Sequence, residues 1–230
     1  MTAPFAIHDA DVVLTDLALS ALGAYLAWRL FRVPAKGILV RHGVVIMAAL
    51  ASAAFWGALF HAVFPGTSTR IGFLAWLPVA LSIAVIGMAL LALALRVVAP
   101  RIPQRARRAA VAVYGAAFVL TVVLVDSSYR TIVCFYAPVV VLFLVVAAAQ
   151  AVRTRNRGWT LIAASFALSL FAAWVQQSGI SIHPHFDHNA LYHVLQGIAL
   201  VLLYRGFVRA PAIPETSDEP ERSRRDPGAS

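Results

Sequence analysis

The stretch "SIHPHFDHNALYHVLQGIALVLLYRG", residues 181–206, joins a group of polar side chains to an apolar run long enough to cross a bilayer. Its first half holds four of the seven histidines of the chain within eleven residues, together with an aspartate and an asparagine. Imidazole and carboxylate groups are costly in hydrocarbon. Their position where an apolar helix begins therefore indicates a buried polar site near one membrane face.

The rest of the 230-residue chain has the same membrane character, because 61% of its residues are hydrophobic and only 13% are charged. Soluble domains carry roughly 25% charged residues. Hydropathy predicts seven transmembrane spans, at roughly 11–31, 42–64, 72–96, 107–126, 130–151, 158–178 and 189–208. We therefore expect an all-α, polytopic membrane protein, with a seven-helix domain over 1–210 and a disordered cytoplasmic tail over 211–230 that is rich in proline, serine and charge.

The basic residues predict the orientation of the bundle. They gather in the first, third and fifth connections and after the last span: Arg29, Arg32, Lys36, Arg41, Arg96, Arg101, Arg105, Arg107, Arg108, Arg153, Arg155, Arg157, Arg205 and Arg209. The alternate connections carry only Arg70 and Arg130. The positive-inside rule then places the N-terminus outside and the C-terminus inside. This placement explains the net charge of +9 without nucleic acid as a partner, and the Ala-, Val- and Arg-rich composition favours a bacterial plasma membrane.

This topology brings scattered polar residues to one depth. Asp16, His61 and His193 are expected within about 10 Å of the outer interface, at a rise of about 1.5 Å per residue. Asp126, Gln176 and Gln177 share that level. In the last span, Asn189, His193 and Gln196 stand at i, i+4 and i+7, and so lie along one side of the helix. A polar stripe of this kind should face the interior of the bundle.

Two segments carry a resemblance to a known superfamily: "SAAFWGALFHAVFP", residues 52–65, and "DHNALYHVLQGIALVLLYRG", residues 187–206. They resemble the CREST superfamily of heptahelical membrane proteins, which includes the alkaline ceramidases and the progestin and adiponectin receptor group. The ending is also similar to a bacterial group of uncharacterised membrane proteins. The resemblance implies hydrolysis of an amide in a lipid by a bound zinc ion. In that superfamily the zinc ligands are one histidine of the second helix and two histidines of the seventh helix.

The match to that zinc site is partial. His61 and His193 stand at two of the three ligand positions, and Asn189 stands at the third. His188 lies one position before Asn189, and Gly57 stands where the superfamily has a serine. The aspartate that the superfamily has near the third helix finds no match in "TSTRIGFLAW", residues 67–76.

A zinc-dependent hydrolase is accordingly one hypothesis. Its metal ligands are His61 and His193 with His188 or Asp187, and Asp16 is a candidate further ligand. Asp16 or Asp126 is then the catalytic carboxylate that orients a ligand or accepts a proton. Zinc at such a site keeps a water as its fourth ligand, lowers the pKa of that water and polarises an ester or amide carbonyl. The depth of the site suits a lipid-like substrate taken from the surrounding membrane lipids.

The alternatives are not enzymes. In a heptahelical sensor or small-molecule binding protein, the same groups form a hydrogen-bonded pocket: Asp16, His61, Asp187, Asn189, His193 and Gln196, with Tyr192 and Trp174 as aromatic lining. A proton-coupled transporter would use Asp16 and His193 as a relay. Contacts between such side chains can also simply hold helices together.

Overall fold

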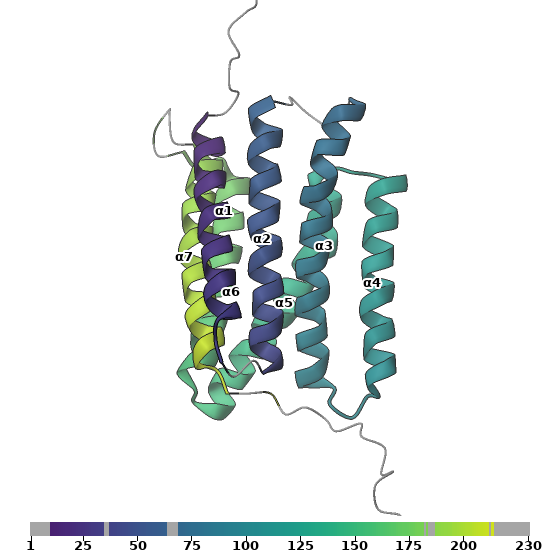
Figure 1. Ribbon diagram of the computed structural model, residues 1–230, viewed down its shortest axis with the longest axis vertical. Coiled ribbons are helices and arrows are strands. Elements are labelled where there is room, and N and C mark those ends of the chain that lie inside the picture. The colour runs from purple at the N-terminus through teal and green to yellow at the C-terminus, as the bar shows by residue number, and fades with distance from the viewer. Residues whose placement is uncertain are drawn as a thin grey trace, which may run out of the picture.

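The computed structural model describes residues 10–34, 37–63, 69–181, 183, 187–211 and 213, and nearly all of them are helical. The helices are α1 (Ala10–Phe31), α2 (Ile38–Val63), α3 (Arg70–Val98), α4 (Gln104–Leu124), α5 (Tyr129–Thr154), α6 (Arg157–Ser178) and α7 (His188–Arg209) (Figure 1). Each of the seven is long and apolar enough to cross a membrane. The prediction of an all-α, seven-span membrane protein is confirmed, whereas the tail predicted after residue 210 lies almost entirely outside the described residues.

Local sequence explains where several helices begin. Asn156 accepts hydrogen bonds from the backbone of Gly158 and Trp159 at the start of α6, and Asp187 does the same for Asn189 and Ala190 at the start of α7. Ser128 likewise caps α5. Such side chains satisfy amide groups that have no partner within the helix. The polar residues before the last span therefore have a structural task as well as any functional one.

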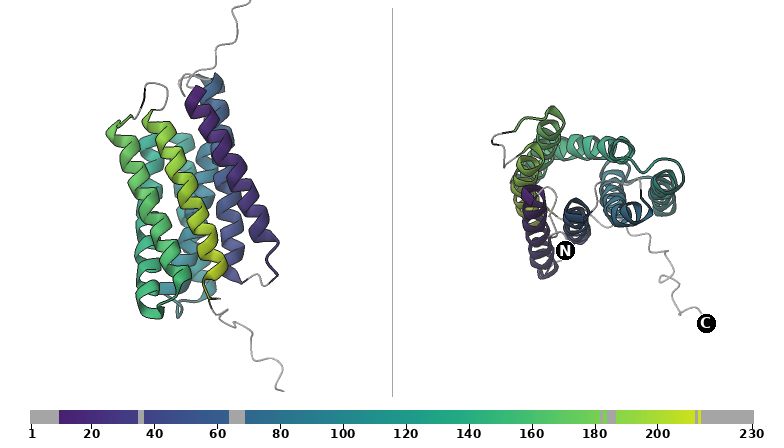
Figure 2. Two further views of the ribbon diagram at one scale, coloured as in Figure 1. Left: turned by 90° about the vertical axis from the view of Figure 1, so that its left-hand side faces the viewer. Right: turned by 90° about the horizontal axis from the view of Figure 1, so that it is seen from above.

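Six of the seven helices form a ring. Each helix contacts the next in the order α1, α2, α3, α5, α6, α7, and α7 contacts α1, which closes the ring. Seen from above, these helices are arranged around a common centre, and α4 lies outside, packed on α3 and less closely on α5 (Figure 2). Large apolar side chains of α4, such as Val113 and Leu120, are accordingly exposed on the outer surface of the bundle. A residue on α4 is thus far less able to reach the centre than a residue at the same depth on a ring helix.

Charge separates the two ends of the bundle. The arginines of the first, third and fifth connections lie at one end, where α1 finishes and α2 begins. The described aspartates, Asp11, Asp16, Asp126 and Asp187, lie at or near the other end. The two ends are therefore chemically distinct, as the positive-inside argument requires. Which end faces the cytoplasm stays a prediction.

At the basic end, α6 and α7 approach closely at two glycines. A Cβ atom on Gly206 would lie 2.6 Å from Ile162 Cγ1 and 3.0 Å from the carbonyl oxygen of Gly158. A Cβ atom on Gly158 would lie 2.2 Å from the backbone nitrogen of Ala210. Small residues at these positions permit the contact that joins the last two helices.

We expect Gly206→Ala to destabilise the bundle by about 1–3 kcal/mol, because backbone atoms of α6 must move to admit the methyl group. Gly197→Ala in the same helix is the matched control, since a Cβ atom there would meet only Leu22 Cδ2 at an ordinary 3.6 Å. Thermal unfolding in detergent, followed by helical circular dichroism, measures both variants. Equal melting temperatures for the two would contradict the close approach.

Candidate functional site

The space inside the ring is a cavity of about 540 Å³. Its wall includes residues from all six ring helices and none from α4 among the described residues. The polar members near the acidic end are Asp16, His61, Ser127, Ser128, Tyr129, Gln176, Asn189, Tyr192, His193 and Gln196. Towards the basic end the wall turns apolar, with Ile46, Val140, Phe166, Leu200 and Leu203. The cavity is therefore polar at one end and hydrocarbon at the other.

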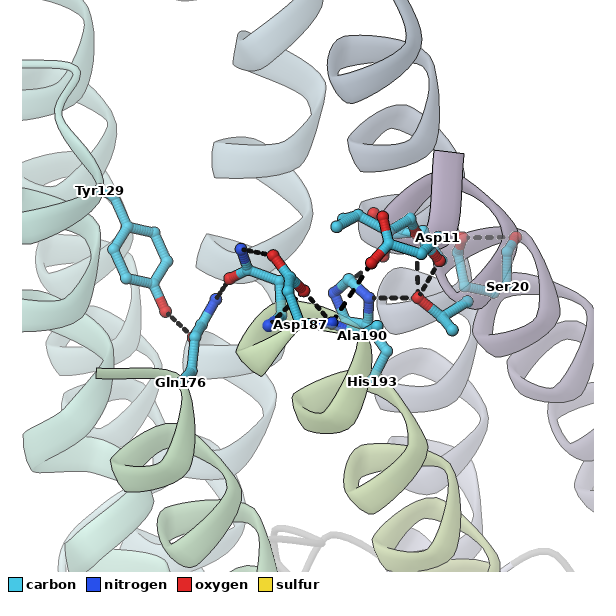
Figure 3. Close-up of polar contacts among 12 residues, drawn as sticks. Asp11, Ser20, Tyr129, Gln176, Asp187, Ala190 and His193 are labelled. Carbon is cyan, nitrogen blue, oxygen red and sulfur yellow. Dashed lines mark hydrogen bonds and ion pairs between the residues drawn. The ribbon is translucent and has the colours of Figure 1, made fainter. Parts of the chain in front are cut away.

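The strongest contact at the polar end joins α1 to α7. Asp16 Oδ1 lies 3.2 Å from His193 Nε2 (Figure 3). Both residues are buried, with 5% of Asp16 and 9% of His193 exposed. A carboxylate and an imidazole at this depth stabilise each other, whereas either one alone would be expensive. The pair lines the cavity, so it is also positioned to meet a ligand.

Thr15 also contacts His193, and neither hydropathy nor depth predicted this contact. Its Oγ1 lies 3.0 Å from His193 Nδ1, and it also lies 2.9 Å and 3.0 Å from the carbonyl oxygens of Asp11 and Val12. A hydroxyl has one proton, and the two carbonyls can only accept. We therefore assign the Thr15 proton to the helix carbonyls and the Nδ1 proton to the imidazole.

This assignment determines what the contact with Asp16 requires. With Nδ1 protonated, His193 Nε2 and Asp16 Oδ1 can form a hydrogen bond at 3.2 Å only if one further proton lies between them. The pair is either an imidazolium with a carboxylate or a neutral imidazole with a carboxylic acid, and its net charge is zero in both forms. A site of this kind can donate and accept hydrogen bonds without presenting an unbalanced charge.

A second set of hydrogen bonds joins α5, α6 and α7 at the polar end of the cavity. The Tyr129 hydroxyl donates to Gln176 Oε1 at 3.0 Å, and Gln176 Nε2 donates to Asn189 Oδ1 at 3.1 Å. Asn189 Nδ2 in turn donates to Asp187 Oδ2 at 3.2 Å (Figure 3). Deeper in the cavity, Ser169 donates to Gln196 Oε1 at 2.9 Å. Most of the polar groups therefore already have defined partners and fixed orientations.

Of the other predicted pocket residues, Tyr192 lines the cavity and its ring lies 5.2 Å from that of His193. Asp187 is the N-cap of α7, and its backbone nitrogen lies 3.3 Å from Asp11 Oδ2. Trp174 does not line the cavity, because it is 55% exposed and stacks on Phe171 on the outer face of α6. The sequence indicates the level of Trp174 along the bundle, but not the side of α6 on which it lies.

Asp126, predicted as a catalytic carboxylate, lies outside the cavity wall. It is exposed between α4 and α5 and accepts hydrogen bonds from the backbone and hydroxyl of Ser128 and from the hydroxyl of Thr131. These bonds, with that of the Ser128 hydroxyl largest, hold the pKa of Asp126 below its usual value. A carboxylate of lowered pKa is a weak base, so its evident task is to fix the start of α5.

The predicted zinc ligands are only partly brought together. His61 and His193 line the same cavity, whereas His188 is the first residue of α7 and is not part of the cavity wall. Both ring nitrogens of His193 already contact protein oxygens. Among the described residues, no group of three or more His, Cys, Asp or Glu side chains is arranged to hold a metal ion. The described His, Asp and Cys side chains therefore do not match the three-ligand zinc site that the resemblance implies.

We expect Asp16→Leu or His193→Leu alone to lower the free energy of unfolding by roughly 3 kcal/mol, because each leaves a buried polar partner behind. The double variant should cost less than the sum of the two, since both partners are then apolar. Asp126→Leu, on the exposed loop, is the control for removal of a carboxylate. Additive losses in thermal unfolding would show that Asp16 and His193 do not depend on each other.

Comparison with known proteins agrees with the extent of the bundle. No curated protein and no solved structure matches the chain. A family model matches residues 12–211, from the first turn of α1 to just beyond the end of α7. The chain therefore belongs to DUF6962, a family of unknown function.

Proposed function

We propose that this protein binds a neutral amphiphilic molecule drawn from the membrane, with its polar head at the Asp16–His193 pair and its apolar part in the depth of the cavity. The observation that carries the proposal is the gradient along the cavity wall. On α7 the wall runs from Asn189 to Leu203, about 21 Å along the helix axis. That length covers much of a hydrocarbon core of about 30 Å.

The gradient repeats on the facing helices. On α2 the wall passes from His61 at the polar end to Ile46, and on α6 it passes from Gln176 to Phe166. A cavity of about 540 Å³ lies within the range of about 300–1,000 Å³ that is typical of small-molecule sites. A purely polar ligand would leave the deep wall unmatched, and a pure hydrocarbon would make no hydrogen bond to the polar end of the cavity.

The charge of the wall favours a neutral head. None of the described residues that line the cavity is a lysine or arginine. The carboxyl group of Asp16 is matched by His193, so a phosphate or carboxylate head would be buried without a dedicated cation. Amide, hydroxyl and carbonyl groups instead suit the donors and acceptors of Gln176, Asn189 and Gln196. Fatty amides, fatty alcohols and monoacylglycerols belong to this class.

Oleamide serves as a probe of this proposal, with octadecane and oleate as comparisons that lack the head or carry a charge. We expect oleamide to raise the melting temperature of the purified protein in a saturable manner, and the other two to have little effect. Gln176→Leu should weaken oleamide binding about fivefold, because it removes hydrogen bonds worth about 1 kcal/mol. Gln177→Leu, at the exposed neighbouring position, is the matched control.

A rise in melting temperature with octadecane as large as that with oleamide would show that the polar end does not contribute to recognition. A response to oleate alone would point to a cation at the site and contradict the neutral head. Equal oleamide binding by Gln176→Leu and Gln177→Leu would show that oleamide does not bind at the polar end of this cavity.

Zinc-dependent hydrolysis of a lipid amide or ester stays a prediction from the resemblance, and metal content tests it separately. Because His193 is held by Asp16 and Thr15, we expect far less than one zinc per purified chain by mass spectrometry. His61→Ala and His193→Ala should then leave the metal content unchanged. About one zinc per chain, lost in both variants, would instead support a hydrolase with a rearranged site.

A further inference from the structure

A second cavity lies at the basic end of the bundle, outside the ring. Its volume is about 310 Å³, and its wall is formed by α2, α3 and α4. Both α2 and α4 pack on α3, but these two helices make no contact with each other among the described residues. The cavity is therefore a groove between α2 and α4 over α3, on the side of the bundle that faces lipid. The proposed amphiphile site is at the opposite end and takes no part in it.

The wall of this groove combines cations with hydrocarbon. Its charged members are Arg96 of α3 and Arg107 and Arg108 of α4, joined by His42 and Gln104. Its apolar members are Ile38, Met88, Ala92, Val111 and Ala112. No acidic residue is among the described residues that line it. A groove with this wall matches a ligand that has an anionic head and an apolar body.

Two of the three arginines, Arg96 and Arg107, are partly or fully buried in the bundle. Arg107 is only 7% exposed, and its Nη1 lies 3.5 Å from the carbonyl oxygen of Ala99 in the connection between α3 and α4. Arg96 is half-buried in the last turn of α3, and Arg108 is exposed in the second turn of α4. Three arginines from two helices thus line one groove. Guanidinium groups bind phosphate oxygens in pairs, with defined geometry.

The depth of the groove agrees with the head-group region. Arg96 lies two residues before the end of α3, about 3 Å along the axis. Arg107 lies three residues after the start of α4, which is about 5 Å. Helix α4 begins after Pro103, which makes no side-chain cap bond, so the positive end of its dipole adds to the field there. The apolar members from Met88 and Val111 lie deeper, where acyl chains would run.

We propose that this groove binds an anionic phospholipid, with the phosphate held by Arg96, Arg107 and Arg108 and an acyl chain laid between α2 and α4. Basic sites between transmembrane helices at the cytoplasmic face are typical positions for anionic head groups. The charge of the wall and its apolar floor favour a lipid over a free anion, which would gain nothing from Met88, Ala92 and Val111. The lipid would join the outlying α4 to the ring.

Native mass spectrometry of the full-length protein tests the proposal, with phosphatidylglycerol and phosphatidylcholine of the same acyl chains as probes. We expect phosphatidylglycerol to be retained about tenfold more than phosphatidylcholine. The double variant Arg96→Gln/Arg108→Gln should reduce that retention about tenfold, while Arg153→Gln/Arg157→Gln, which removes the same charge from exposed positions at the same end, should leave it within about twofold. Arg108→Lys should lie between the wild type and Arg108→Gln, because a lysine keeps the charge but not the paired geometry.

Three results would overturn the lipid site. One is equal retention of the two lipids by the wild type, and another is an equal loss in the two double variants, which would indicate general charge attraction. The third is displacement of phosphatidylglycerol by inorganic phosphate alone, which would indicate a site for free anions. Circular dichroism of each variant shows whether it is folded, and the single exposed variant Arg108→Gln gives the same test if the double variant is not.

The tail beyond the last helix offers a competing occupant. Its sequence carries five carboxylates, at Glu215, Asp218, Glu219, Glu221 and Asp226. A full-length variant with these residues changed to their amides should retain as much phosphatidylglycerol as the wild type. A several-fold rise in retention would mean that the tail occupies the groove, and would contradict a resident lipid.

Discussion

The contact between Asp16 and His193 is the constraint on which the arrangement of this bundle depends. A carboxyl group and an imidazole are both costly in hydrocarbon, and each removes the cost of the other only if α1 and α7 are neighbours at the same depth. Their contact closes the ring of six helices between its first and last members. The ring encloses the cavity, so the Asp16–His193 pair and the cavity both depend on the packing of α1 against α7.

The Asp16–His193 pair also restricts which residues can lie beside it. A Cβ atom on Gly57 of α2 would lie 3.0 Å from Asp16 Oδ2, so the carboxyl group occupies the space that a larger residue would need. Thr15 holds the other side of the imidazole through Nδ1. A side chain larger than glycine at position 57 would therefore require the Asp16 carboxyl group to move.

The sequence predicted how deep a residue lies along the bundle, but not its direction around the helix axis. Hydropathy predicted seven helices because the length of an apolar run is set by the bilayer, and depth then placed Asp16, His61 and His193 at one level, where all three line one cavity. Depth says nothing about direction around a helix or about membership of the ring. Asp126 and Trp174 share that level but lie outside the cavity wall, one after α4, which stands outside the ring, and one on the outer face of α6. Thr15 gave no signal, because a threonine in a helix usually bonds only its own backbone.

The two cavities differ in a way that follows from the separation of charge along the chain. The arginines of the first, third and fifth connections all lie at one end, and three of them line a groove on the outer side of the bundle. The ring cavity at the other end has no arginine in its described wall and holds its one carboxyl group in a neutral pair. Anionic and neutral amphiphiles would therefore be sorted by head-group charge, each to its own end. A molecule that carries a phosphate would gain three cations at the groove and lose its hydration without compensation in the ring. Under the predicted orientation, the positive-inside rule would thus also keep cations away from the central cavity and make that cavity selective for neutral head groups.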